Sequence, residues 1–127
     1  VMKRVLITTG ILLAIISVSL GSLVYIHSTI SRLELQITEI EEEVLREDYQ
    51  AAQAHTTELV THWHQVEPIL VRLVRHSAID ETTGDLAKLP YLLEYEHYGE
   101  FMSELSRAKM IILRSWEDEV PNLKNIL

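Results

Sequence analysis

Histidine and glutamate side chains recur along one segment at a spacing that suits a divalent metal ion. The chain has six histidines and no cysteine, so any metal ligands would be imidazoles and carboxylates. His55, Glu58 and His62 fall at positions i, i+3 and i+7, which places them on one face of a helix. We interpret these three residues as a candidate metal site. The alternative is that they only occupy the solvated face of an amphipathic helix, because the sequence identifies no ligand from a second helix.

Other arrangements that would support catalysis are missing from the sequence. The lack of cysteine excludes a thiol nucleophile, and there is no Gly-x-Ser-x-Gly elbow or glycine-rich phosphate loop. The acidic runs Glu41-Glu42-Glu43 and Glu117-Asp118-Glu119 are more typical of solvated helix faces or helix ends than of acid–base pairs. We therefore predict a protein that is not an enzyme and that carries no cofactor.

An apolar run near the N-terminus is long enough to cross a membrane. Residues 5–28 contain no Lys, Arg, Asp or Glu, and a membrane helix needs roughly 20 mostly apolar residues. Lys3 and Arg4 precede the run, whereas all nineteen acidic residues follow it. The positive-inside rule then predicts a single-pass protein of the cell membrane, with residues 1–4 cytoplasmic and residues 29–127 extracytoplasmic. A cleaved signal peptide is the alternative, but its apolar region would be only about 7–15 residues long.

Residues 29–127 form one acidic segment that the sequence predicts to be helical throughout. This segment contains nine Lys or Arg residues and nineteen Asp or Glu residues, and the resulting net charge of −10 argues against nucleic-acid binding. Asp48 is a candidate N-cap for a second helix, and Ile79-Asp80 for the start of a third. A fourth helix is predicted from about Tyr98 to Glu117, with Val120-Pro121 as its stop.

The apolar positions of these helices recur every three or four residues, which predicts a shared core. The predicted core residues are Ile30, Leu33, Ile37, Ile40, Val44, Leu59, Trp63, Leu70, Leu105, Ile112 and Trp116. Short connections favour antiparallel neighbours. The expected fold is therefore all-α: one transmembrane helix that continues into a small antiparallel bundle of about four helices.

Small residues line one face of the predicted membrane helix. Gly10, Ala14, Ser17 and Gly21 fall at i, i+4, i+7 and i+11, a pattern that lets two helix backbones approach closely in lipid. Glycine and serine are common in membrane helices in general, so a chance pattern is the alternative. At about 100° per residue, this stripe points roughly 150° away from the apolar seam of residues 30–44.

The chain resembles a family of short bacterial membrane proteins classed as a domain of unknown function, number four-three-six-three. The resemblance is carried by Trp63 with Ile69-Leu70, by His76 with Ile79-Asp80, and by Val120-Pro121 before the closing residues 122–127. Gly84 and Pro90 depart from the family pattern. The resemblance implies a membrane complex with a multi-pass partner, and it transfers no catalytic residue.

Together these patterns predict a non-enzymatic, membrane-anchored accessory or scaffolding subunit. Its partners would be membrane lipid and either a multi-pass membrane protein or a second copy of the chain, joined through the transmembrane helix. The alternative function is an extracytoplasmic ligand-sensing or metal-sensing helical domain that acts through a partner.

Overall fold

A computed structural model of the chain describes the backbone of residues 1–74 and 76–126, and the side chains of residues 1–74, 76–115 and 117. Four helices fill almost all of this length: α1 (Met2–Leu45), α2 (Tyr49–Leu73), α3 (His76–Glu94) and α4 (Tyr98–Ile126). The described residues include no strand. The predicted all-α class, with a long apolar first helix, is confirmed.

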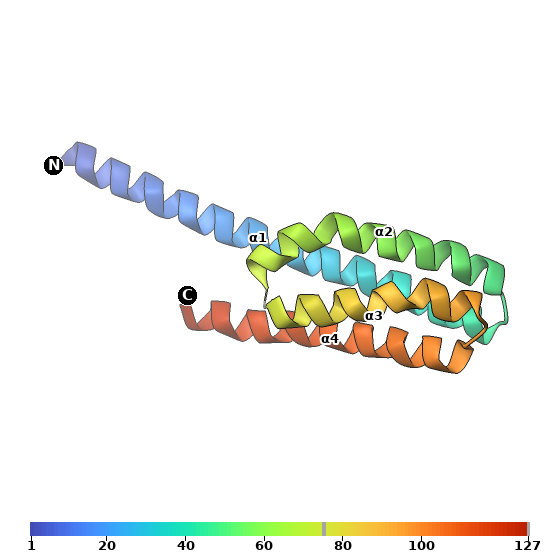
Figure 1. The fold of residues 1–127 in the computed structure, drawn as a ribbon. Coiled ribbons are helices and arrows are strands. Elements are labelled where there is room, and N and C mark those ends of the chain that lie inside the picture. The colour runs from blue at the N-terminus through green and yellow to red at the C-terminus, as the bar shows by residue number, and fades with distance from the viewer. Residues whose placement is uncertain (75, 127) are drawn as a thin grey trace.

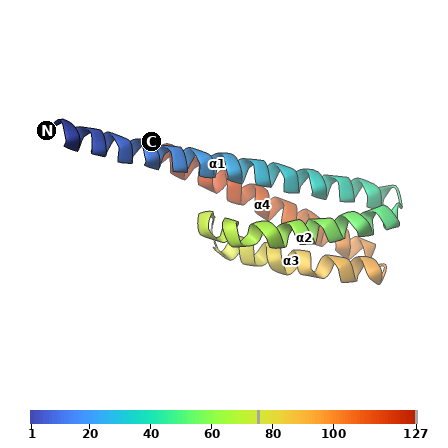
Figure 2. The same ribbon diagram turned by 90° about the horizontal axis from the view of Figure 1, so that it is seen from above.

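The helices form an antiparallel bundle in which each helix packs against two others. Contacts join α1 to α2, α2 to α3, α3 to α4 and α4 back to α1 (Figures 1 and 2). The connections within the described chain are two or three residues long, as expected for adjacent antiparallel helices. The N-terminal half of α1 extends well beyond the bundle (Figure 1).

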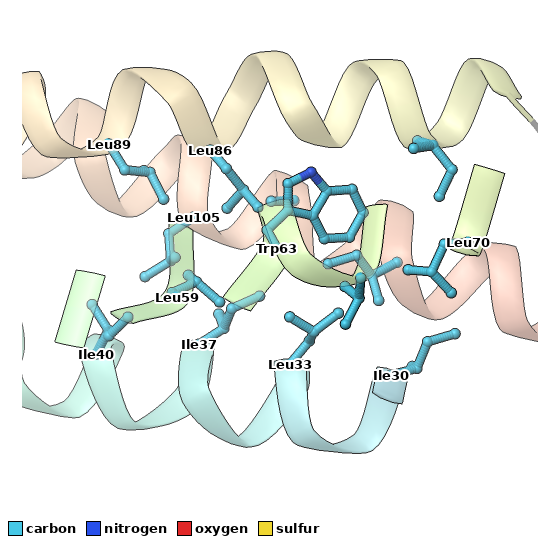
Figure 3. Close-up of a cluster of buried hydrophobic side chains, with 14 of the residues drawn as sticks. Ile30, Leu33, Ile37, Ile40, Leu59, Trp63, Leu70, Leu86, Leu89 and Leu105 are labelled. Atoms are coloured by element: carbon cyan, nitrogen blue, oxygen red, sulfur yellow. The ribbon is translucent and has the colours of Figure 1, made fainter. Parts of the chain in front are cut away.

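The bundle is held together by one continuous apolar core. Trp63 is its largest side chain and is only 1% exposed. Figure 3 shows its indole among residues contributed by several helices, and the indole Nε1 donates a hydrogen bond of 2.9 Å to Thr83 Oγ1 on α3. Of the residues expected in the core, the structure buries Ile30, Leu33, Ile37, Ile40, Val44, Leu59, Trp63, Leu70, Leu105 and Ile112. Trp116 lies outside the described side chains.

The N-terminal half of α1 stands apart from this core. The first core residue on α1 is Ile26, and the large apolar side chains of residues 1–20 are exposed around the whole helix. This segment is long and apolar enough to cross a membrane. Gly10, Ala14, Ser17 and Gly21 are all exposed, and among the described atoms nothing lies within 4 Å of a Cβ built at either glycine.

Two predicted helix boundaries are wrong. The third helix begins at His76 rather than at Ile79-Asp80, and the extended backbone of Val74 (φ −129°, ψ 164°) ends α2 shortly before it. The fourth helix continues past Val120-Pro121 to Ile126. A proline removes one backbone hydrogen bond without necessarily ending a helix, and Pro68 and Pro90 likewise lie inside α2 and α3.

The turn between α1 and α2 closes α1 in a left-handed conformation. Glu47 has a φ of 60°, and its N–H donates to Val44 O at 3.0 Å, while Asp48 N–H donates to Glu43 O at 2.9 Å. These two bonds define a Schellman motif, in which glycine is the usual residue at the left-handed position. The predicted cap is confirmed, because Asp48 Oδ1 accepts from Ala51 N–H at 3.3 Å. The same pattern recurs between α3 and α4, where Glu96 has a φ of 63°.

Glu47→Gly is expected to raise the free energy of unfolding by about 0.5–1 kcal/mol, since glycine adopts this backbone conformation without the Cβ clash of glutamate. Urea unfolding of the full chain in detergent, followed by far-UV circular dichroism, measures the change. Arg46→Gly is the matched control, because Arg46 has a φ of −83° and glycine there only adds unfolded-state entropy. A loss of stability in Glu47→Gly would contradict the strain argument.

Candidate functional site

Three chemically reactive side chains meet where α1 packs against α2. Glu39 and Glu43 lie one turn apart on α1, and His55 faces them from α2. His55 Nδ1 hydrogen-bonds to Glu43 Oε1, and His55 Nε2 lies 3.8 Å from Glu39 Oε1. One ligand atom from each residue lies within 4.8 Å of the other two. We call Glu39, Glu43 and His55 the hairpin cluster.

Burial differs sharply within the hairpin cluster. The Glu43 side chain is only 2% exposed, whereas His55 is 35% exposed and Glu39 is 57% exposed. The expectation that Glu41-Glu42-Glu43 lies wholly on a solvated face is therefore wrong for Glu43. Its position is i+3 from Ile40 and adjacent to Val44, which turns it toward α2 and the core. That spacing was the only available sequence signal for its burial.

The predicted metal triad along α2 does not come together. His55 points to Glu43, whereas His62 Nδ1 donates to Gln36 Oε1 at 2.7 Å, and Glu58 is exposed between them. Residues i and i+7 lie two helical turns apart, about 10.5 Å along the axis, and the two imidazoles are hydrogen-bonded to different residues of α1. Only His55 of the triad belongs to the group of potential ligands found among the described residues.

Comparison with known proteins places the chain in a family. Residues 20–126 match the family described as a domain of unknown function, DUF4363. The chain belongs to this family. No curated protein and no solved structure matches the chain significantly. The DUF4363 match spans the helical bundle, including the hairpin cluster.

The pKa values of two histidines of this DUF4363 chain are shifted in opposite directions. The hydrogen bond that His55 donates to Glu43 raises the pKa of His55, against partial desolvation, and the charges of Glu43, Glu39 and Glu58 raise it further. Partial burial lowers the pKa of His62, and the positive charge of Arg32 adds to this. His55 is thus favoured as imidazolium and His62 as neutral imidazole.

These shifts predict that the two histidines together stabilise the DUF4363 fold most near pH 6.5. Below the unfolded-state pKa of about 6.5, the unfolded chain binds more protons at His62, so stability falls as pH decreases. Above pH 6.5 the folded chain binds more protons at His55, so stability falls as pH rises through its raised pKa.

Urea unfolding from pH 5 to 8 in the presence of EDTA tests this pH dependence of the free energy of unfolding. His55→Gln should remove the decline above pH 6.5, and His62→Gln the decline below it. Each variant serves as the control for the other. A profile that both substitutions leave unchanged would contradict the assignment.

Proposed function

We propose that this protein is a non-enzymatic, membrane-anchored accessory or scaffolding subunit. The observation that carries the proposal is the N-terminal half of α1, an apolar helical segment that projects from a bundle whose own core is already buried (Figure 1). A helix that is apolar all round suits a lipid environment. Residues 5–24 would span about 30 Å at 1.5 Å per residue, the thickness of the hydrocarbon core.

The charge distribution supports an orientation with the bundle outside the cell. Lys3 and Arg4 flank one end of the apolar segment, and the acidic bundle follows the other end. Basic residues are retained on the cytoplasmic side, so the proposed topology has a cytoplasmic N-terminus and an extracytoplasmic bundle at residues 29–127.

The small-residue stripe supports assembly with another membrane protein. Gly10, Ala14, Ser17 and Gly21 leave one face of α1 open to close approach by a second helix. Because α1 is one continuous helix, the stripe lies roughly 150° from the seam that packs into the bundle. A multi-pass partner could therefore bind α1 in the membrane without displacing α2 or α4.

Affinity purification from native membranes in mild detergent, with mass spectrometry, tests the proposal. We expect the wild-type chain to recover a multi-pass protein, and Gly10→Leu/Gly21→Leu to recover at least several-fold less of it. Thr8→Leu/Ser19→Leu is the matched control, because it enlarges small residues on the opposite face of α1. Recovery of the monomer alone, or equal partner recovery by both variants, would contradict a stripe-mediated assembly.

A further inference from the structure

The hairpin cluster contains a buried carboxylate that its neighbours satisfy only in part. Glu43 is 2% exposed, and its Oε1 accepts from His55. Its second oxygen, Oε2, is buried and has no hydrogen-bond partner among the described residues. A buried carboxylate oxygen without a partner is costly, because water no longer solvates its lone pairs. A cation bound at this oxygen would offset that cost.

The electrostatic surroundings of His55 favour a cation further. The charges of Glu43, Glu39 and Glu58 all act on the single imidazole of His55. Three carboxylates against one imidazole leave an excess of negative charge even when the imidazole is protonated. One side of the cluster also opens to solvent through Glu39 and His55, so an ion has a route to Glu43.

From these observations we propose that Glu39, Glu43 and His55 bind a divalent transition-metal ion of the zinc class across the α1–α2 hairpin. The site is distinct from the triad along α2, because its ligands come from two helices and converge on one point. It is also independent of the proposed membrane role, since it lies within the bundle.

The donor set matches this class of ion. One imidazole nitrogen with two carboxylate groups is typical of borderline ions such as zinc, whereas magnesium prefers an octahedral shell of oxygens. The three ligand atoms now lie within 4.8 Å of one another. To bind zinc, each of them would need to approach to about 2.0–2.2 Å from the ion. The exposed Glu39 and half-exposed His55 can make this adjustment by changing rotamers, and an imidazolium at His55 releases one proton to solvent on binding, because only the neutral imidazole coordinates a metal ion.

Both oxygens of Glu43 can bind the ion in this geometry. They share one carbon, so an ion bound to Oε1 lies within reach of Oε2 and can be held by both. Metal binding would thus satisfy the orphan oxygen and link α1 to α2 near their connecting turn. A ligand that binds only the folded chain also stabilises it, so the ion should raise the melting temperature.

Isothermal titration calorimetry with zinc chloride on the full chain in detergent tests the site, with magnesium chloride as the ion control. We expect one zinc ion per chain and a rise in melting temperature of roughly 10 °C at a hundredfold excess over Kd. Magnesium should bind far more weakly. The absence of zinc binding to the wild-type chain, or equal affinities for zinc and magnesium, would overturn the proposal.

Variants then locate the ion. His55→Ala and Glu39→Gln should each weaken zinc binding at least about tenfold, because each removes a direct ligand. Glu39 is exposed, so Glu39→Gln tests the site even if His55→Ala fails to fold. His62→Ala is the control for a histidine on the same helix outside the cluster, and it should bind zinc like the wild type. Unchanged affinity in Glu39→Gln, or an equal loss in His62→Ala, would overturn the assignment.

Discussion

Trp63→Ala is expected to lower the free energy of unfolding by about 3–5 kcal/mol, the largest loss from any single truncation in the bundle. The indole is 1% exposed and lies among apolar residues of the neighbouring helices (Figure 3). Its removal leaves a cavity next to a gap that Trp63 already lines with Ile30 and Ile79. It also leaves Thr83 Oγ1 without its indole donor. A loss of this size would consume much of the stability of a small domain.

Far-UV circular dichroism during urea unfolding of the full chain in detergent measures this loss. Ile69→Ala is the matched control, because Ile69 lies on the same helix but is 45% exposed, and it should change stability by less than about 1 kcal/mol. Thr83→Val keeps the shape of the threonine side chain and isolates the contribution of the hydrogen bond from the indole. A loss below about 1 kcal/mol in Trp63→Ala would mean that the packing in Figure 3 is wrong.

Leu12→Arg/Ile16→Arg is expected to release the protein from the membrane. An arginine near the middle of a membrane helix costs roughly 3 kcal/mol on insertion scales, so two arginines with the loss of two apolar side chains cost about 6–7 kcal/mol. Both residues lie away from the small-residue stripe, so the change acts on the contact with lipid. The wild-type chain should stay with the membrane pellet after alkaline carbonate extraction, and the variant should enter the supernatant.

The control for this experiment lies on the same helix. Leu35 and Leu45 are exposed apolar residues on the part of α1 that belongs to the bundle. Leu35→Arg/Leu45→Arg adds the same two charges outside the apolar segment and should leave the protein in the membrane pellet. Release of the wild-type chain by carbonate, or retention of Leu12→Arg/Ile16→Arg, would contradict a membrane-spanning role for α1.

The sequence was informative wherever structure depends on local periodicity. The 3–4 spacing of Ile30 through Val44 identified the buried face of α1, because a helix brings such positions to one side. Asp48 was recognisable as a cap, because capping involves only the first turn of its own helix. Pro121 does not end its helix for a related reason: whether a helix survives a lost hydrogen bond depends on packing that the local sequence does not contain.

The hairpin cluster could not be derived in the same way. His55 and Glu43 are brought together by the turn between α1 and α2, and their register depends on its length and on the left-handed Glu47. Periodicity placed His55 on the same face as Glu58 and His62, but it could not show that α1 supplies the opposing carboxylates. The burial of Glu43 is a tertiary property, since the neighbouring Glu42 is exposed in the same acidic run.

We propose that α1 anchors the acidic bundle on the outside of a cell membrane. The chain has no cysteine, so single introduced cysteines report their location without background. Lys3→Cys marks the N-terminal end, and Ser103→Cys marks an exposed position on α4 in the bundle. We predict that a membrane-impermeant maleimide labels Ser103→Cys in intact cells and labels Lys3→Cys only after lysis. Labelling of Lys3→Cys in intact cells, or protection of Ser103→Cys until lysis, would contradict the account.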